Sequence, residues 1–181
     1  MMIRMLLVSL FLFVGVIPSF ARESLREVEG VVRRVVDGDT IQVVDRQGTL
    51  LKVRLYGIDA PETAKYARKT GKMIKAGQPF GEEAYQALQR RLDNQSVQLS
   101  IQAVDRYHRV VALVWLGKRN INQEMVQEGW GWAYRQYLGR PYASSFIALE
   151  EQARQQHVGL WQQSNPQPPW EFRRLMRSQR R

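Results

Sequence analysis

The sequence predicts an α+β fold that is mainly β: a small, closed, five-stranded barrel with about three helices. Short alternating or β-branched segments are separated by turn residues, which is typical of strands in a small all-β core. The strands are arranged as hairpins, and the helical patterns follow the third and the fifth strand. Hairpins pair neighbouring strands antiparallel, so an antiparallel barrel fits better than a parallel sheet.

The first three strands are expected at 28–36, 39–44 and 49–56. An Asp37-Gly38 turn between the first two is a strong hairpin signal. In the third strand, the period-two alternation puts Leu51, Val53 and Leu55 on one face and Lys52, Arg54 and Tyr56 on the other. Arg54 is therefore expected to point away from the core.

Residues 63–81 are expected to form a mobile basic loop, because they contain five basic and no acidic side chains between Thr63 and Gly81 and are interrupted by glycine and proline. This loop either guides a nucleic-acid strand or is simply solvated. A helix is expected at 80–93, with acidic residues in its first turn and basic residues near its end.

The second hairpin is expected at 96–104 and 110–116. In its first strand the alternation places Val97, Leu99, Ile101 and Ala103 inward, and the apolar second strand reads as buried on both faces. Two helices should follow: a short one capped by Asn122, and a longer one over 144–156.

Length, charge and composition exclude several classes. A chain of 181 residues corresponds to one domain with appendages. The net charge of +10 favours polyanionic partners such as nucleic acid or acidic lipid. With no cysteine, the chain has neither disulfides nor thiolate metal sites, and two histidines make a histidine-rich metal site improbable.

The chain divides into three segments. Residues 1–21 read as an export signal: an apolar run follows Arg4, and Ser19 and Ala21 supply the small residues of a cleavage site before Arg22. An uncleaved signal anchor is the alternative. Residues 22–163 form the predicted globular domain. Residues 164–181 form a tail rich in proline and arginine, expected to be irregular and either draped over the domain or free. The protein is therefore expected in the periplasm or outside the cell.

The chemistry is expected from carboxylates and arginines. The chain lacks a phosphate-binding P-loop, a serine-hydrolase elbow and a zinc-protease motif. Its chemically suggestive residues are Asp39, Arg54, Asp59, Glu62 and Arg109. Carboxylates can hold a hard cation or position water, and guanidinium groups match phosphoryl oxygens bidentately. Such a set suits phosphodiester hydrolysis.

Three blocks resemble, in order, the signatures of the staphylococcal nuclease family. They are Val35-Val36-Asp37-Gly38-Asp39-Thr40, the run from Val53 to Glu62 (VRLYGIDAPE), and Asp105-Arg106-Tyr107-His108-Arg109-Val110. The resemblance covers roughly residues 28–161. It implies an OB-fold barrel and a Ca²⁺-dependent endonuclease that acts on DNA and RNA and leaves 3′-phosphates.

The resemblance also implies a role for each matching residue. Asp39 and Asp59 would ligate Ca²⁺ through their carboxylates, and Ala60 through its carbonyl. Glu62 matches the general base, and Arg54 and Arg109 match the phosphate-binding arginines. Tyr107 and Tyr134 fall near tyrosines of the nucleotide pocket. His108 stands where glycine is common, which bears on the shape of its turn.

Two other function classes stay open. A non-catalytic nucleic-acid binder of the same fold would be marked by the loss of an acidic ligand or an arginine, and none is lost. A cationic membrane-active protein should carry an amphipathic basic helix, but the helices expected here mix acids and bases. No protein partner is implied, and a monomer is expected.

Overall fold

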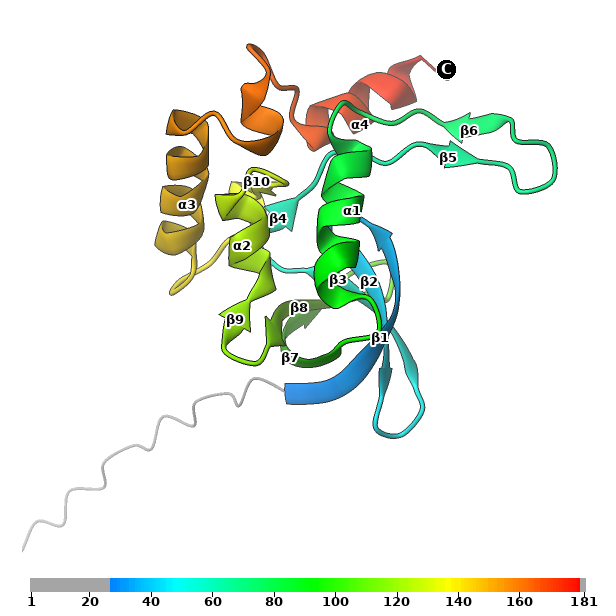
Figure 1. Ribbon diagram of the computed structural model, residues 1–181, viewed down its shortest axis with the longest axis vertical. Helices are drawn as coiled ribbons and strands as arrows, with labels where there is room; N and C mark the ends of the chain where they lie inside the picture. The colour runs from blue at the N-terminus through cyan, green and yellow to red at the C-terminus, as the bar shows by residue number, and fades with distance from the viewer. Residues whose placement is uncertain (1–26, 180–181) are drawn as a thin grey trace, which may run out of the picture.

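The structure is a computed structural model that describes residues 27–179 (Figure 1). The expected export signal, residues 1–21, lies outside the described residues, as do Arg180 and Arg181 at the end of the tail. Among the described residues, no helix is both long and apolar enough to cross a membrane.

Five strands form the barrel, as predicted, but its closure is different. The barrel strands are β1 (Glu27–Asp37), β2 (Thr40–Asp45), β3 (Leu50–Leu55), β7 (Ser96–Val104) and β8 (Val110–Leu116). They lie in the order β3-β2-β1-β7-β8, with antiparallel neighbours, and β3 then pairs with β8 in parallel. The barrel is thus mixed, and the expectation of an entirely antiparallel barrel was wrong.

The described residues form four α-helices, one more than expected (Figure 1). They are α1 (Gly81–Leu92), α2 (Ile121–Gln127), α3 (Ala143–Gln155) and α4 (Pro169–Ser178), and two 3₁₀ turns occur at η1 (Arg135–Tyr137) and η2 (Gly159–Gln162). The described residues also form five short strands: β4 (Ile58–Asp59), β5 (Lys65–Tyr66), β6 (Met73–Lys75), β9 (Arg119–Asn120) and β10 (Trp132–Ala133).

The inward faces of the strands form one core with the helices. Val32, Ile41, Val53 and Leu99 are fully buried, and Leu88 of α1 joins them. Each fully buried aliphatic side chain contributes about 1.5–3 kcal/mol of transfer free energy. The core therefore fixes the register of the strands that carry the polar residues of the barrel mouth.

One inward position was wrongly predicted at the end of β7. Ala103 is exposed, although the alternation placed it inside with Val97 and Leu99. A register shift between Ile101 and Ala103 in the β7–β8 pairing breaks the alternation. Val104, the next residue, is exposed too, so the end of β7 extends beyond the core.

The first hairpin turn is shifted by one residue from its expected place. Asp37 pairs with Thr40, so the two turn residues are Gly38 and Asp39 rather than Asp37 and Gly38. A Cβ on Gly38 would lie 2.7 Å from the Cβ of Ala60 and 2.9 Å from that of Ala84. Glycine at position 38 therefore lets the turn that carries Asp39 approach the end of β4 closely.

The basic segment after β4 has more structure than expected. Strands β5 and β6 pair antiparallel and form a ribbon that projects from the body of the molecule (Figure 1). Tyr66, Met73 and Ile74 are exposed on this ribbon. The expectation of a loop without strands was wrong here.

The tail is also more ordered than expected, because most of it is helix α4. Pro169 occupies the first turn of α4, where proline needs no hydrogen-bond partner for its nitrogen. Trp170 packs on a cluster of buried residues that includes Trp132, Leu160 and Trp161. The tail thus folds back on the domain.

Helix α2 begins two residues earlier than expected, because Asn120 is its cap. The Oδ1 of Asn120 accepts a hydrogen bond from the backbone N–H of Gln123 at 3.1 Å. The residue expected to cap the helix, Asn122, is instead fully buried. Its amide accepts from Val114 N–H at 2.8 Å and donates to the carbonyls of Tyr56 (2.9 Å) and Ala112 (3.0 Å).

The substitution Asn122→Ala is expected to destabilise the fold by about 3 kcal/mol, because each buried backbone group left unpaired costs about 1–3 kcal/mol. Urea unfolding followed by tryptophan fluorescence measures this loss. The neighbouring Gln123→Ala is the control: it removes a single side-chain bond, to Ser145 at 3.2 Å, and should cost less than about 1 kcal/mol. Equal losses of unfolding free energy in the two variants would show that the backbone hydrogen bonds of Asn122 do not stabilise the fold.

Candidate functional site

Two buried carboxylates meet at the mouth of the barrel, one from the β1–β2 turn and one from β4. Asp39 is 4% exposed and Asp59 is fully buried. The backbone N–H of Ala60 donates to Oδ2 of Asp39 at 2.9 Å, and the pairing of β4 with β10 places Asp59 opposite Trp132. Residues distant in the sequence are thus brought together as the resemblance implied.

Arg54 joins the two carboxylates. Its guanidinium forms an ion pair with Asp39, and its Nη2 lies 2.6 Å from Oδ1 of Asp59 and 3.2 Å from the carbonyl oxygen of Ile58. The side chain lies on the outward face of β3, as the alternation predicted, and only 15% of it is exposed. A mostly desolvated guanidinium between carboxylates is a strong charge-assisted contact.

Glu62 lies just beyond β4 and is held on both sides. Its backbone N–H donates to Oε1 of Gln78 at 3.1 Å, and its carboxylate pairs with Lys75 of β6. Burial alone raises the pKa of Glu62, but the hydrogen bonds and charges of Lys75 and Arg173 outweigh it and lower the pKa below its ordinary value. Glu62 is therefore ionised at neutral pH.

This lowered pKa predicts a loss of stability in acid. A carboxyl group whose pKa is lower in the folded than in the unfolded chain stabilises the fold above its unfolded pKa, and this contribution disappears as the pH falls through the folded pKa. Between pH 5 and pH 3, the free energy of unfolding should therefore fall more steeply for the native chain than for Glu62→Gln. Urea unfolding at each pH measures this free energy. If it falls equally with pH in both proteins, Glu62 is not ionised and paired in the folded chain.

A residue that the sequence did not suggest completes the cluster: Arg173 of α4. Its Nη1 and Nη2 lie 3.0 and 2.8 Å from the two carboxylate oxygens of Asp59, and Nη1 lies 3.0 Å from Oε1 of Glu62. Burial alone would lower the pKa of Arg173, but Asp59 and Glu62 raise it, so the group stays charged. The tail thus contributes a cation to the site.

Arg109 and Tyr107 form their contacts with neighbouring turn residues and not with this cluster. Arg109 immediately precedes the part of β8 that pairs with β3, and its guanidinium is paired with Asp105, with Nη2 2.7 Å from Oδ2. Tyr107 is 62% exposed and packs under the guanidinium groups of Arg106 and Arg109. His108 has a φ of 57°, the left-handed conformation that glycine favours, so the turn keeps this shape without a glycine.

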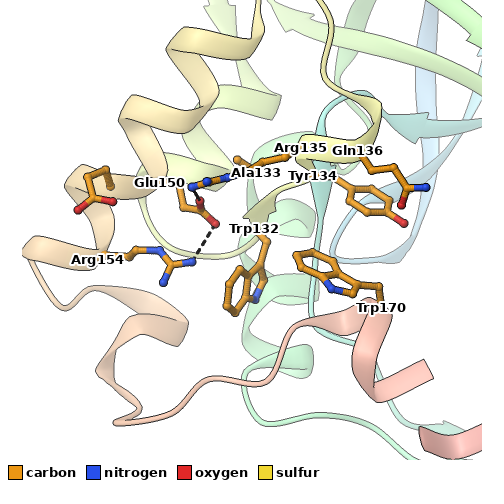
Figure 2. Close-up of a pocket in the computed structure, with 9 residues that line it drawn as sticks. Trp132, Ala133, Tyr134, Arg135, Gln136, Glu150, Arg154 and Trp170 are labelled. Carbon is orange, nitrogen blue, oxygen red and sulfur yellow. Dashed lines mark hydrogen bonds and ion pairs between the residues drawn. The ribbon is translucent and has the colours of Figure 1, made fainter. Parts of the chain in front are cut away.

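Tyr134 lies where the tail meets the body of the domain. Its ring stacks on Trp170 with the centroids 5.4 Å apart and the planes 4° from parallel. Burial and the charge of Asp59 raise the pKa of Tyr134. A cavity of about 660 Å³ opens beside this pair and contains Glu150, whose carboxylate is held by Arg135 and Arg154 (Figure 2).

The donor set at the mouth of the barrel suits a hard cation. Asp39 and Asp59 offer carboxylate oxygens, which Ca²⁺ and Mg²⁺ prefer over nitrogen or sulfur ligands. Within residues 27–179, no group of three or more histidine, cysteine, aspartate or glutamate side chains is placed to bind a metal. A cation here would need backbone oxygen or water to complete its coordination.

Sequence reasoning missed Lys75, Gln78 and Arg173 as parts of the site. Lys75 belongs to the basic segment that was expected either to guide a nucleic-acid strand or to be solvated, and nothing in its spacing distinguishes it from its neighbours. Arg173 is one of several arginines in the tail. The one available signal was Pro169, a residue typical of the start of a helix.

The chain is similar in sequence to known nucleases. The family model described as "Staphylococcal nuclease homologue" matches residues 52–163. The chain is 37% identical to a micrococcal nuclease of Shigella flexneri over 171 residues, which cover 90% of this chain and 87% of the relative. It is 34% identical to an uncharacterized endonuclease of Haemophilus influenzae (94% and 85% covered) and 34% identical to a thermonuclease of Staphylococcus hyicus (81% and 83%). These similarities show that the chain belongs to the staphylococcal nuclease family.

Proposed function

We propose that this nuclease is an exported, Ca²⁺-dependent endonuclease that hydrolyses phosphodiester bonds of DNA and RNA and leaves 3′-phosphate ends. The observation that carries the proposal is the meeting of Asp39, Asp59, Arg54 and Glu62 at one end of the barrel. Its membership of the hydrolase class follows from the family, whose relatives described above are named as nucleases. The Ca²⁺ requirement and the position of the cut follow from the resemblance.

Asp39 and Asp59, with the carbonyl of Ala60, would hold the cation, as expected from the sequence. When bound, Ca²⁺ would supply positive charge that stabilises the charge developing on the phosphoryl oxygens. Asp59 is fully buried, and the nearly buried Asp39 is held by the backbone N–H of Ala60, just after β4. Their low exposure also limits competition by water.

Arg54 and Arg109 would bind the phosphoryl oxygens of the substrate. A guanidinium group presents two parallel N–H donors that match two oxygens of a phosphate. Both side chains are now paired with carboxylates, Arg54 with Asp39 and Asp59, and Arg109 with Asp105. A phosphate would therefore have to replace these partners.

Glu62 would accept the proton of the attacking water. A lowered pKa keeps it ionised, and it can act only after it is freed from Lys75 and Arg173. Tyr134, and Tyr107 at the exposed turn, would contact the nucleotide through their rings. The net charge of +10 attracts a polyanionic substrate, and the distance over which this attraction acts becomes shorter as the salt concentration rises.

Degradation of DNA and of RNA by the purified chain 22–181 tests this function. Cleavage is expected with Ca²⁺ and not with a chelator, and treatment of the products with a phosphatase should release inorganic phosphate from their 3′ ends. A series with Mg²⁺ tests the choice of cation. Binding of either nucleic acid without cleavage at any cation concentration would favour the non-catalytic binder.

Export and oligomeric state need separate measurements. The full chain, expressed in a bacterium, should be recovered from the periplasm or the medium as a product that begins at Arg22, which N-terminal sequencing identifies. Sedimentation should give the mass of a monomer. A product that retains residues 1–21 in the membrane fraction would instead indicate a signal anchor.

A further inference from the structure

Helix α4 lies against the carboxylate cluster and is held there by aromatic contacts. Beyond its stacking on Tyr134, Trp170 meets Trp132 edge-on, with the centroids 5.5 Å apart and the planes at 73° (Figure 2). Just before the helix, the backbone carbonyl of Gln167 accepts a hydrogen bond from Nε2 of Gln78 at 3.0 Å. The same Gln78 binds the backbone of Glu62, so the tail is attached directly to the residues that shape the site.

Arg173 projects from this anchored helix and occupies the carboxylate oxygens. It binds both oxygens of Asp59, at 3.0 and 2.8 Å, and one oxygen of Glu62, at 3.0 Å. The other oxygen of Glu62 is taken by Lys75, and Arg54 also binds Oδ1 of Asp59. Every carboxylate oxygen of Asp59 and Glu62 therefore already has a cationic partner from the chain itself.

We propose that Arg173 is a built-in competitor of the divalent cation: α4 closes the site by placing its guanidinium on Asp59, and cation binding requires Arg173 to leave. Ca²⁺ binds carboxylate oxygens at 2.3–2.6 Å, within the space in front of the oxygens that the guanidinium now fills. Two like charges on the same carboxylate would also repel each other. The inference rests on the proposed function in one respect, that Asp59 is a cation ligand.

The aromatic contacts determine how strongly the helix competes. A tethered group acts at a high effective concentration, so even a weak contact can hold the site closed. The apparent dissociation constant for the cation rises by the reciprocal of the fraction of open molecules. If about 1–10% of molecules are open, removal of Arg173 should increase Ca²⁺ affinity about 10–100-fold.

Calorimetric titration of the chain 22–181 with CaCl₂, without nucleic acid, tests the competition. Arg173→Gln should bind Ca²⁺ at least about tenfold more tightly than the native chain. Arg173→Lys, which keeps the charge but loses the bidentate fork, should lie between them. Arg174→Gln is the matched control, because Arg174 is exposed on the same helix and forms no ion pair within residues 27–179, and its affinity should equal the native value.

Hydrogen–deuterium exchange over residues 169–178 gives a second readout. In the native chain, saturating Ca²⁺ should speed the exchange of α4 by releasing Arg173. In Arg173→Gln, exchange should already be fast without the cation. Exchange of the core strands β2 and β3 should be unchanged in both proteins, which shows that the variant folds.

Several results would overturn the inference. These are equal Ca²⁺ affinities in the native chain and Arg173→Gln, an α4 as well protected with saturating Ca²⁺ as without it, and no Ca²⁺ binding by either protein. Nuclease assays of the same samples separate this inference from the proposed function. Cleavage with equal affinities would reject only the competition, and tighter binding by Arg173→Gln without cleavage by any protein would reject only the catalytic role.

Discussion

Arg54→Lys is expected to lower the turnover of DNA by at least about 100-fold while the fold stays intact. A lysine keeps the positive charge, but its ammonium group cannot form the two parallel hydrogen bonds that a guanidinium forms with a phosphate. Loss of one such contact in a transition state costs about 3 kcal/mol or more, which corresponds to a factor of about 100 or more. Arg109→Lys should lower turnover by a similar factor, because the two arginines would bind different oxygens of the same phosphate.

The controls for these variants come from arginines outside the cluster. Arg46 lies in the exposed turn after β2, where it pairs with Glu29, and Arg106 lies in the same turn as Arg109 and packs on Tyr107, so Arg46→Lys and Arg106→Lys are the controls. Both should retain native turnover at saturating Ca²⁺. Steady-state rates on a defined oligonucleotide, with thermal unfolding of each variant, make the comparison. Native turnover in Arg54→Lys or Arg109→Lys would remove that arginine from the phosphate-binding group.

The strands of the barrel were predictable because each has a local sequence pattern, either alternation or flanking turn residues. Alternation in 51–56 placed Arg54 outside, and it lies there. What closes the barrel is the parallel contact of β3 with β8, and that contact joins segments more than fifty residues apart. Turn residues and alternation describe a single hairpin, so a non-local pairing of this kind leaves no pattern in either strand.

The acidic part of the cluster was also predictable, because its members lie in short blocks around turns. Asp39, Asp59 and Glu62 occupy positions where the chain leaves a strand, and the family resemblance names them. Of the cations in the cluster, only Arg54 was predicted as a site residue. Lys75 and Arg173 come from a ribbon and a helix whose sequences contain several similar cations, and tertiary packing alone decides which of them reaches the carboxylates.

The tail shows why composition misleads in such a case. Three prolines and five arginines after Ser164 predicted irregular structure. Yet the prolines precede α4 or occupy its first turn, where they do not interrupt helical hydrogen bonds, and Trp170 supplies the apolar contact that attaches the helix. A single aromatic anchor outweighs the polar character of the remaining side chains.

Separate roles for Asp59 and Glu62 give the second large expected effect. Asp59→Asn should weaken Ca²⁺ binding, because an amide offers one neutral oxygen in place of a charged carboxylate, and extra Ca²⁺ should recover part of the lost rate. The same substitution removes a partner of Arg54 and Arg173, so the variant's thermal unfolding must be measured alongside its affinity. Asp37→Asn, in the strand just before the Gly38–Asp39 turn, is the control and should keep its calcium affinity.

Glu62→Gln should behave differently, because its contribution belongs to the transition state. The amide is nearly the same size but cannot accept the proton of the attacking water, so the rate at saturating Ca²⁺ should fall about 10²–10⁴-fold and extra cation should not restore it. Glu82→Gln, exposed on α1, should leave the rate unchanged. Calorimetry and cleavage rates over one Ca²⁺ series decide between the roles. Loss of calcium affinity in Glu62→Gln but not in Asp59→Asn would reverse the two assignments, and full activity in both variants would show that neither carboxylate takes part in the cleavage.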